Sequence, residues 1–197
     1  MTPDDALTAL LIATRNLVSA TPALRDFTGP RLERLGYARP AAQSLPVADR
    51  LPALMPLAAP ATAEITFAVL AAAPHLHWQQ SYSEAQVGAH YLANYGWFNL
   101  VSPEGPYVAQ DFRISVGYWE QGLTYPQHAH APEEIYCVLA GGATFASDGR
   151  AAQTAGAGEL IHHAPNQMHG FAMEQTPLLA MAFWKGDALT AKPTLAG

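Results

Sequence analysis

The sequence predicts a mainly β protein, built as a sandwich or a small barrel, that follows an α-helical segment. Two observations support this fold class. Leu and Ala recur at helical spacing through residues 1–73. From Pro74 onward, Gly, Pro and Asn separate short runs of aromatic and β-branched residues, which is the pattern of strands joined by close turns. We therefore predict an N-terminal helical segment at residues 1–73 and a β-barrel domain at residues 74–197.

The helical segment opens with a clear start signal. Thr2 is a good N-cap, Pro3 suits the first helical position, and the acidic Asp4 and Asp5 suit the positive end of the helix dipole. This helix should end at Pro22. Its apolar face is formed by Leu7, Leu10, Leu11, Leu17 and Val18. Further helices are expected at Pro30–Leu35 and Ala61–Ala73, with prolines breaking the region between them into short helices and turns.

The β domain should contain at least seven strands, because apolar and β-branched residues gather in seven short runs. These runs are Phe98–Val101, Phe112–Glu120, Glu134–Leu139, Ala143–Ser147, Glu159–His162, Met168–Met173 and Leu178–Trp184. The pair Gly141–Gly142 between two of them is typical of a hairpin turn.

The composition of the chain limits the kinds of molecule with which it is expected to interact. The net charge of -6 offers no basic surface for a phosphate backbone, so nucleic acid is not an expected partner. No apolar run approaches the ~20 residues that span a bilayer, and the acidic N-terminus is unlike a secretory signal. The single Cys137 excludes an internal disulfide, fits a buried thiol and suits a reducing compartment. We expect a cytoplasmic enzyme that acts on a small-molecule substrate.

Histidines and an acid in the β domain are spaced as a metal site requires. His128 and His130 share one parity along a strand, so their side chains point to one face. Glu134 follows after a bend at Ala131–Pro132. Two imidazoles and a carboxylate suit a borderline divalent metal and leave coordination positions open for chemistry. His169, on a later strand, could complete the ligand set.

Two tyrosines accompany these ligands. Tyr136 lies two positions beyond Glu134, so it should face the same cavity, and Tyr125 precedes His128 by three positions. A phenol has a pKa of about 10, but a nearby divalent cation favours the phenolate. Tyr136 would then be a general base; the alternative is that it packs in the barrel and bonds a carbonyl group.

The remaining histidines receive no metal role from their spacing. His162 and His163 are adjacent, so one of them should face outward from the strand. His75, His77 and His90 are expected to be surface or packing residues.

The two histidine-bearing segments resemble the cupin superfamily, whose fold is a jelly-roll-like β-barrel. The first cupin motif is matched at every spacing by Gly122, His128, His130, Glu134 and Gly141. The second motif is matched at Gly158 and His169. In that motif Ala164, Asn166 and Met173 stand where cupins have Pro, Gly and Asn.

Over most of its length the chain also resembles the bacterial cupin-type dimethylsulfoniopropionate (DMSP) lyases. The resemblance includes the helical N-terminus, the stretch from Gln127 through Glu134–Leu139, His169 and Phe183–Trp184. It implies β-elimination of DMSP to dimethyl sulfide and acrylate, with a metal that binds the substrate carboxylate. The implied metal ligands are His130, Glu134 and His169, with His128 ligating or close by. The implied catalytic residues are Tyr136 as the base, Tyr125 and His128.

Substrate binding is assigned to aromatic side chains, since their faces can hold the sulfonium cation. The candidates are Tyr125, Trp184, Tyr91, Tyr95 and Trp97. The metal is one divalent transition ion, and zinc, iron, manganese, nickel and cobalt all suit the ligands.

Three alternatives to this function or arrangement stay open. The chain could be another metal-dependent cupin enzyme, such as an iron dioxygenase or a sugar isomerase, or a non-catalytic cupin that binds a small molecule. It could form a homodimer through apolar faces of its N-terminal helices.

Overall fold

The computed structural model describes residues 1–196. Its helices are α1 (Pro3–Ala20), α2 (Pro22–Thr28), α3 (Ala63–Ala72) and α4 (Glu84–Ala93), with 3-10 turns at Gly29–Leu32, Pro46–Leu57 and Ala73–His75. Its strands are β1 (Gly36–Tyr37), β2 (Tyr95–Ser102), β3 (Tyr107–Val108), β4 (Phe112–Trp119), β5 (Thr124–Ala129) and β6 (Glu133–Ser147). They continue with β7 (Gln153–Gly156), β8 (Leu160–His163), β9 (His169–Ala172), β10 (Leu178–Lys185) and β11 (Thr194–Leu195).

Helix α1 begins as its sequence predicts. The hydroxyl of Thr2 accepts from the backbone N–H of Asp5 at 3.2 Å, and the Asp5 carboxylate accepts from the backbone N–H of Thr2 at 3.0 Å. This reciprocal pair satisfies two backbone donors that a helix end leaves free. The predicted apolar face, Leu7 through Val18, is buried along its length.

The helices differ from the prediction in two places. The second helix, α2, starts at Pro22 rather than near Pro30, because Pro22 both ends α1 and fits the first position of the next helix. Pro30 lies instead in a short 3-10 turn. Helix α4 was not predicted; a capping box of Ser83 and Gln86 starts it, and Gly88 at φ 80° interrupts it.

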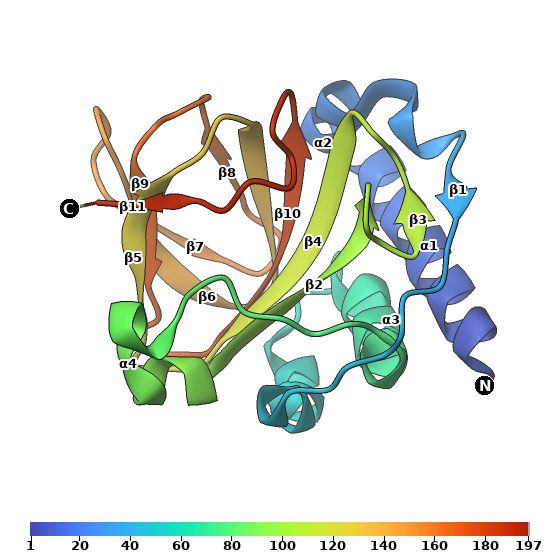
Figure 1. Cartoon of the computed structure of the whole chain (residues 1–197), viewed down its shortest axis with the longest axis horizontal. Coiled ribbons are helices and arrows are strands. Elements are labelled where there is room, and N and C mark those ends of the chain that lie inside the picture. The colour runs from blue at the N-terminus through green and yellow to red at the C-terminus, as the bar shows by residue number, and fades with distance from the viewer. Residues whose placement is uncertain (197) are drawn as a thin grey trace.

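All eleven strands belong to one sheet, in the order β1-β3-β2-β4-β10-β6-β9-β5-β11, with β7 and β8 also paired to β6. The long strand β6 organises it. Its first part pairs with β10 and β8, and its second part pairs with β7 and β9. Figure 1 shows the sheet curling at this strand, so that β5, β9 and β11 face the β4–β10 wall.

The predicted hairpin turn at Gly141–Gly142 is wrong. Both glycines lie inside β6, where the pairing with β10 shifts between Leu179 and Ala180. Gly141 has φ 69°, and a Cβ there would lie 1.8 Å from the Pro177 carbonyl oxygen. Only glycine fits such a position. Gly141 therefore marks an irregularity within the single strand β6, and not a turn between two strands.

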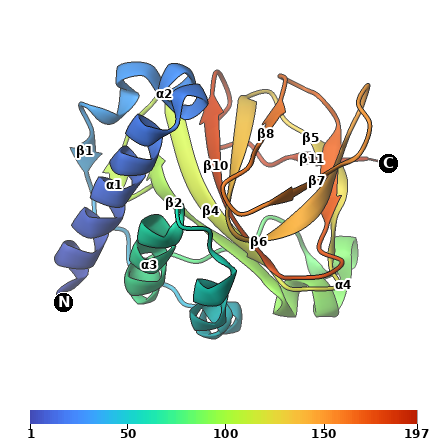
Figure 2. The same cartoon turned by 180° about the vertical axis from the view of Figure 1, so that it is seen from behind.

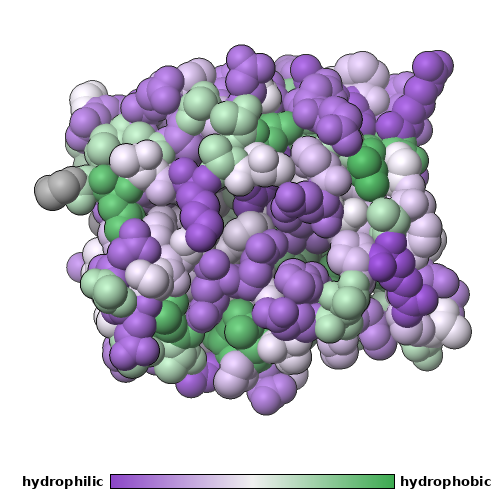
Figure 3. Space-filling model, viewed as in Figure 1, coloured by the Kyte–Doolittle hydropathy of each residue, from purple (hydrophilic) through white to green (hydrophobic). Residues whose placement is uncertain are grey.

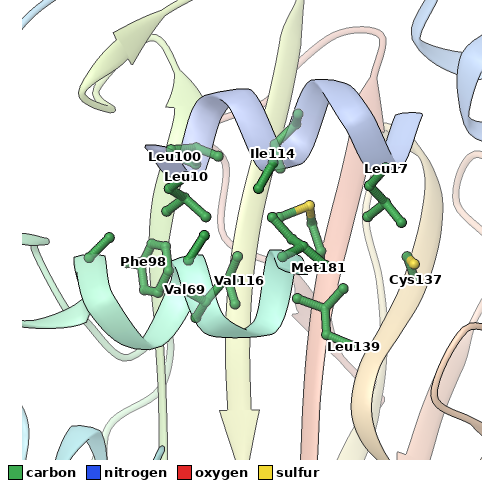
Figure 4. Close-up of a cluster of buried hydrophobic side chains, with 14 of the residues drawn as sticks. Leu10, Leu17, Val69, Phe98, Leu100, Ile114, Val116, Cys137, Leu139 and Met181 are labelled. Carbon is green, nitrogen blue, oxygen red and sulfur yellow. The ribbon is translucent and has the colours of Figure 1, made fainter. Parts of the chain in front are cut away.

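The N-terminal helices cover the back of the sheet (Figure 2). Leu10 and Leu17 from α1 and Val69 from α3 pack on strand residues such as Phe98 and Met181, all in one buried cluster (Figure 4). The other face of the same strands carries a second cluster, rich in Tyr and Trp, which fills the barrel. Helices α1 and α3 therefore support the barrel wall from outside.

Strand β10 illustrates how the two clusters are kept apart. Met181 and Phe183 belong to the helix-side cluster, whereas Ala182 and Trp184 belong to the barrel-side cluster. Successive side chains of a strand point to opposite faces, so the alternation in sequence becomes a division between two interiors. The barrel-side interior is where the predicted ligands lie.

The outer surface is mostly polar in the view of Figure 3, with small scattered hydrophobic patches. On α1 and α3, Ile12 and Phe67 are exposed large hydrophobics, at 49% and 64%. Among the described helices none is by itself long and apolar enough to cross a membrane; α1 and the following helical segment meet the length and hydropathy test only as a pair bent by 111°.

Candidate metal centre and active site

Three strands bring the predicted ligands together. His128 is on β5, Glu134 is on β6 and His169 begins β9, while His130 follows the end of β5 directly. Strand β9 pairs with both β5 and β6, and its register places His169 opposite His128. All four side chains are buried, and Glu134 and His169 are each 0% exposed.

The four groups converge on one point. The Nε2 atoms of His130 and His169 each lie 3.1 Å from the same Glu134 oxygen, Oε2. One ring nitrogen from each of His128, His130 and His169 lies within 4.8 Å of the others. Side chains from separate strands therefore surround a small polar space in an otherwise apolar interior.

Backbone carbonyl groups fix the orientation of the three histidines. In each ring Nδ1 faces a carbonyl oxygen, and because a carbonyl only accepts, Nδ1 must carry the proton. When such a ring is neutral, its Nε2 is left with a lone pair, the form that metals bind. The acceptors are the carbonyl oxygens of Pro126 at 2.9 Å from His128, Pro132 at 2.9 Å from His130 and Gln167 at 2.8 Å from His169.

The pKa shifts favour a neutral His128 beside an ionised Glu134. Burial, aided by His169, lowers the pKa of His128 to about 3, so its ring is neutral at pH 7. Burial acts to raise the pKa of Glu134, but the imidazoles of His130 and His169 outweigh it and hold that pKa well below its usual value. At pH 7 the cluster thus contains the charged carboxylate of Glu134 and the neutral ring of His128.

These residues fit a divalent transition metal. The buried Nε2 of His169 is close to Glu134 but lacks a hydrogen-bond partner among the described residues. A buried polar atom without a partner is costly, and a cation at the centre of the cluster would satisfy it. Imidazoles and one carboxylate are ligands that such ions accept, so the cluster is able to hold one.

A row of residues across the sheet supports the acid from behind. The register places Arg113, Trp184 and Glu134 side by side on β4, β10 and β6. The indole Nε1–H of Trp184 donates to Glu134 Oε1. The ring centroids of Trp184 and His130 lie 4.0 Å apart. The Arg113 guanidinium carbon lies 4.5 Å from the Trp184 ring centroid. Trp184 therefore holds two predicted ligands in place.

The same row settles which of the adjacent histidines faces inward. His163 lies opposite Glu134 on β8, is 0% exposed, and stacks on His169 with ring centroids 3.9 Å apart. His162 points outward, where its Nε2 meets Glu133 at 2.7 Å. His163 received no functional role from the sequence, because its position beside the ligands depends on the β6–β8 register.

A cavity of about 220 Å³ adjoins Glu134, which is the one predicted ligand among its lining residues. Of the predicted substrate-binding residues, Tyr125, Tyr95, Trp97 and Trp184 line it, together with Tyr136 and Glu134. Tyr91 is not among the lining residues; its hydroxyl accepts from Trp119 Nε1 at 3.2 Å. The volume suits a small organic molecule, since one water molecule takes about 30 Å³ in the liquid.

Two residues near the cavity, Tyr82 and Arg113, were not predicted from the sequence, and of these two Arg113 lines the cavity. The hydroxyl of Tyr82 donates to that of Tyr125 at 3.2 Å, and Arg113 stands between the rings of Trp97 and Trp184. Arg113 also donates to Asn99 Oδ1. A lone Arg or Tyr has no spacing signal. The pairing of β4 with β2 and β10 brings Arg113 to the cavity, whereas Tyr82 comes from the segment before α4 and meets Tyr125 there.

Both tyrosines near the ligands are buried. Burial raises the pKa of Tyr136 well above its usual value, and the Glu134 charge adds to the effect. Burial likewise raises the pKa of Tyr125, whose ring stands edge-on to His128 at 4.5 Å. These raised pKa values keep both phenols protonated, and positive charge in the pocket would act in the opposite direction.

Comparison with known proteins identifies the family. A family model described as dimethylsulfoniopropionate lyase matches residues 32–180, which is most of the chain. The chain belongs to the DMSP lyase family. This is a family of carbon–sulfur lyases, and membership agrees with the resemblance found in the ligand motifs.

Individual relatives of this DMSP lyase family member are also similar in structure. The DMSP lyase DddQ of Ruegeria pomeroyi is 32% identical over 131 residues, which span 66% of this chain and 65% of that protein. A crystal structure of that DddQ matches with a TM-score of 0.92 and 30% identity, covering 98% of this chain and 97% of the other.

A chain from crystal structures of the DMSP lyases RdDddP and RnDddQII matches with a TM-score of 0.94 and 36% identity, covering 100% of both chains. A cupin-2 domain from Rhodospirillum rubrum, 16% identical, matches 63% of this chain and 77% of its own with a TM-score of 0.50, and so supports the cupin fold alone. The predicted fold class, a cupin barrel with N-terminal helices, is confirmed.

Proposed function

We propose that this family member is a metal-dependent DMSP lyase that forms dimethyl sulfide and acrylate by β-elimination. The observation that carries the proposal is the placement of Tyr136: it lines the same cavity as Glu134, two positions further along β6. A substrate in this cavity would therefore lie next to both Tyr136, as proton acceptor, and the metal-binding end at Glu134, which stabilises an anion. Family membership supports the choice of DMSP as that substrate.

The ligands we assign to the metal are His128, His130, Glu134 and His169. When bound there, a divalent cation supplies positive charge that stabilises a carboxylate substrate and lowers the pKa of a neighbouring phenol. The substrate carboxylate binds at this end of the cavity. Trp184 keeps the Glu134 carboxylate in place by its indole N–H, and the backbone carbonyl groups keep the imidazoles in their binding tautomer.

The elimination then needs one base. The phenolate of Tyr136 takes the proton from the carbon next to the carboxylate, and the electron pair of that C–H bond forms the new double bond. The C–S bond breaks, its electrons stay on sulfur, and neutral dimethyl sulfide leaves. Since the leaving group is neutral, no acid is required, and Tyr125 is free to serve as a wall of the substrate site.

The sulfonium end is best placed against tyrosines. The ring faces of Trp97 and Trp184 already meet the Arg113 guanidinium, at 4.6 Å and 4.5 Å, so a second cation there would be repelled. Tyr95 and Tyr125, with ring centroids 6.0 Å apart, offer faces without that charge. We therefore assign the sulfonium to the tyrosine side of the cavity.

The test is headspace detection of dimethyl sulfide from purified protein and DMSP, with each metal and with chelator. Activity should require metal and should fall at least about 100-fold in Tyr136→Phe, which removes the acid–base group and little else. The control is Tyr118→Phe: Tyr118 is buried on the helix side of β4, and its hydroxyl bonds Glu120 at 2.9 Å. Absence of dimethyl sulfide with every metal, or consumption of oxygen with DMSP, would refute the proposal.

A further inference from the structure

A second set of metal-binding groups adjoins the first. Donor atoms of Glu134, His163 and His169 also lie within 4.8 Å of one another, and all three residues are buried. This set shares Glu134 and His169 with the set already assigned and adds only His163. Strand β8 therefore contributes a further imidazole to the same polar space.

His163 has the features of a ligand rather than those of a packing residue. Its Nε2 is buried and has no hydrogen-bond partner among residues 1–196. Its ring stacks on that of His169 at an interplanar angle of 11°, which is a packing contact, so the unpartnered nitrogen is the feature that marks it as a ligand. If packing were its only role, an apolar ring would stack equally well and would leave no polar atom unsatisfied.

The second nitrogen of His163 is oriented in the manner seen for the other histidines. Nδ1 lies 3.2 Å from the hydroxyl of Ser147, which is the β6 partner of His169 in the sheet register. A hydroxyl accepts as well as donates, so Nδ1 can carry the proton and give it to Ser147. Nε2 is then left with a lone pair, as a metal requires.

We propose that His163 coordinates the cation held by Glu134 and His169. The metal-binding cluster then has four imidazoles and one carboxylate available from strands β5, β6, β8 and β9 and the turn after β5. The proposal rests on the metal site of the proposed function, but it concerns binding alone and is tested without DMSP.

The matched pair of variants is His163→Phe and His162→Phe. The first keeps the stacked ring and removes the nitrogen atoms, whereas His162 is the adjacent residue that points outward to Glu133. Zinc is loaded into each protein, its dissociation constant is measured by competition with a chromophoric chelator, and coordinated imidazoles are counted by X-ray absorption fine structure.

We expect one coordinated imidazole fewer in His163→Phe than in the wild type, and zinc binding weaker by at least about 10-fold. His162→Phe should match the wild type in both. An equal imidazole count in His163→Phe and the wild type overturns the proposal, even if affinity falls, since a purely structural role changes affinity without removing a ligand.

Ser147→Ala covers the case in which His163→Phe does not fold. It keeps every ring and removes only the group that orients His163, so zinc should bind about 10-fold more weakly. Zinc affinity equal to that of the wild type would then refute the proposal. Because these measurements use no DMSP, a protein that shows the expected coordination but makes no dimethyl sulfide would refute the lyase function and leave this inference intact.

Discussion

Replacing Trp184 by Phe tests whether the indole N–H holds the metal-binding carboxylate in place. The variant keeps an aromatic ring against His130 and Arg113 but removes the donor to Glu134 Oε1. Glu134 is 0% exposed, so no water replaces that donor without reorganisation of the pocket. The carboxylate should become less well positioned, and metal binding should weaken.

The size of the effect follows from two independent scales. A hydrogen bond to a charged group contributes about 1.5–3 kcal/mol. Loss of a group that orients a metal ligand weakens metal binding about 10–100-fold, which corresponds to about 1.4–2.7 kcal/mol. The two ranges overlap, so we expect the zinc dissociation constant of Trp184→Phe to rise by about 10–100-fold.

The assay is competition for zinc against a chromophoric chelator at fixed pH. Trp97→Phe is the control, because Trp97 also meets Arg113, but its Nε1 has no hydrogen-bond partner among the described residues. Its zinc affinity should stay within about threefold of the wild type. Equal losses in both variants would show that aromatic packing matters rather than the hydrogen bond, and no loss in Trp184→Phe would refute the reasoning outright.

Three further predictions concern stability. Leu10→Ala, in the fully buried helix-side cluster, should lower the free energy of unfolding by about 2–5 kcal/mol in urea titrations and leave dimethyl sulfide production by the folded protein unchanged. Gly141→Ala should cost more than about 3 kcal/mol or prevent folding, since its Cβ would lie 1.8 Å from a carbonyl oxygen; Gly149→Ala, also at positive φ but with open space, should cost about 1–2 kcal/mol. In metal-free protein, burial lowers the pKa of both His128 and His163 from 6.5 to about 3, so both stay neutral when folded and become protonated when unfolded. Stability should therefore fall as pH drops below 6.5, by about 1.4 kcal/mol per pH unit for each group, and a urea midpoint that is constant from pH 6.5 to 5 would contradict this.

Local sequence rules found the parts of the site that lie close together in the chain. His128, His130 and Glu134 are separated by a few residues, and the two-residue period of a strand is enough to direct them to one side. The structure does bring these side chains and His169 together. Their role as ligands stays a prediction.

Residues that are brought together only by strand pairing could not be predicted from the sequence. Arg113, Trp184, Glu134 and His163 form one row only because β4, β10, β6 and β8 pair in a particular register. Parity could show that His162 and His163 face opposite ways, but not which of them lies beside the predicted ligands. The incorrect prediction of a turn at Gly141 also arose from strand pairing. Gly141 is required by its contact with the Pro177 carbonyl group, but in the sequence alone it has the pattern of a hairpin turn.

The helical layer behind the barrel has a consequence for engineering. Phe183 faces the helices and Trp184 faces the cavity. Substitutions at these adjacent positions therefore change different parts of the protein, the helix packing in one case and the cavity in the other. Substitutions that improve contacts of α1 and α3 with the sheet could raise heat resistance without altering the shape of the cavity. Libraries that aim at new substrates could in turn be confined to the inward positions of the same strands.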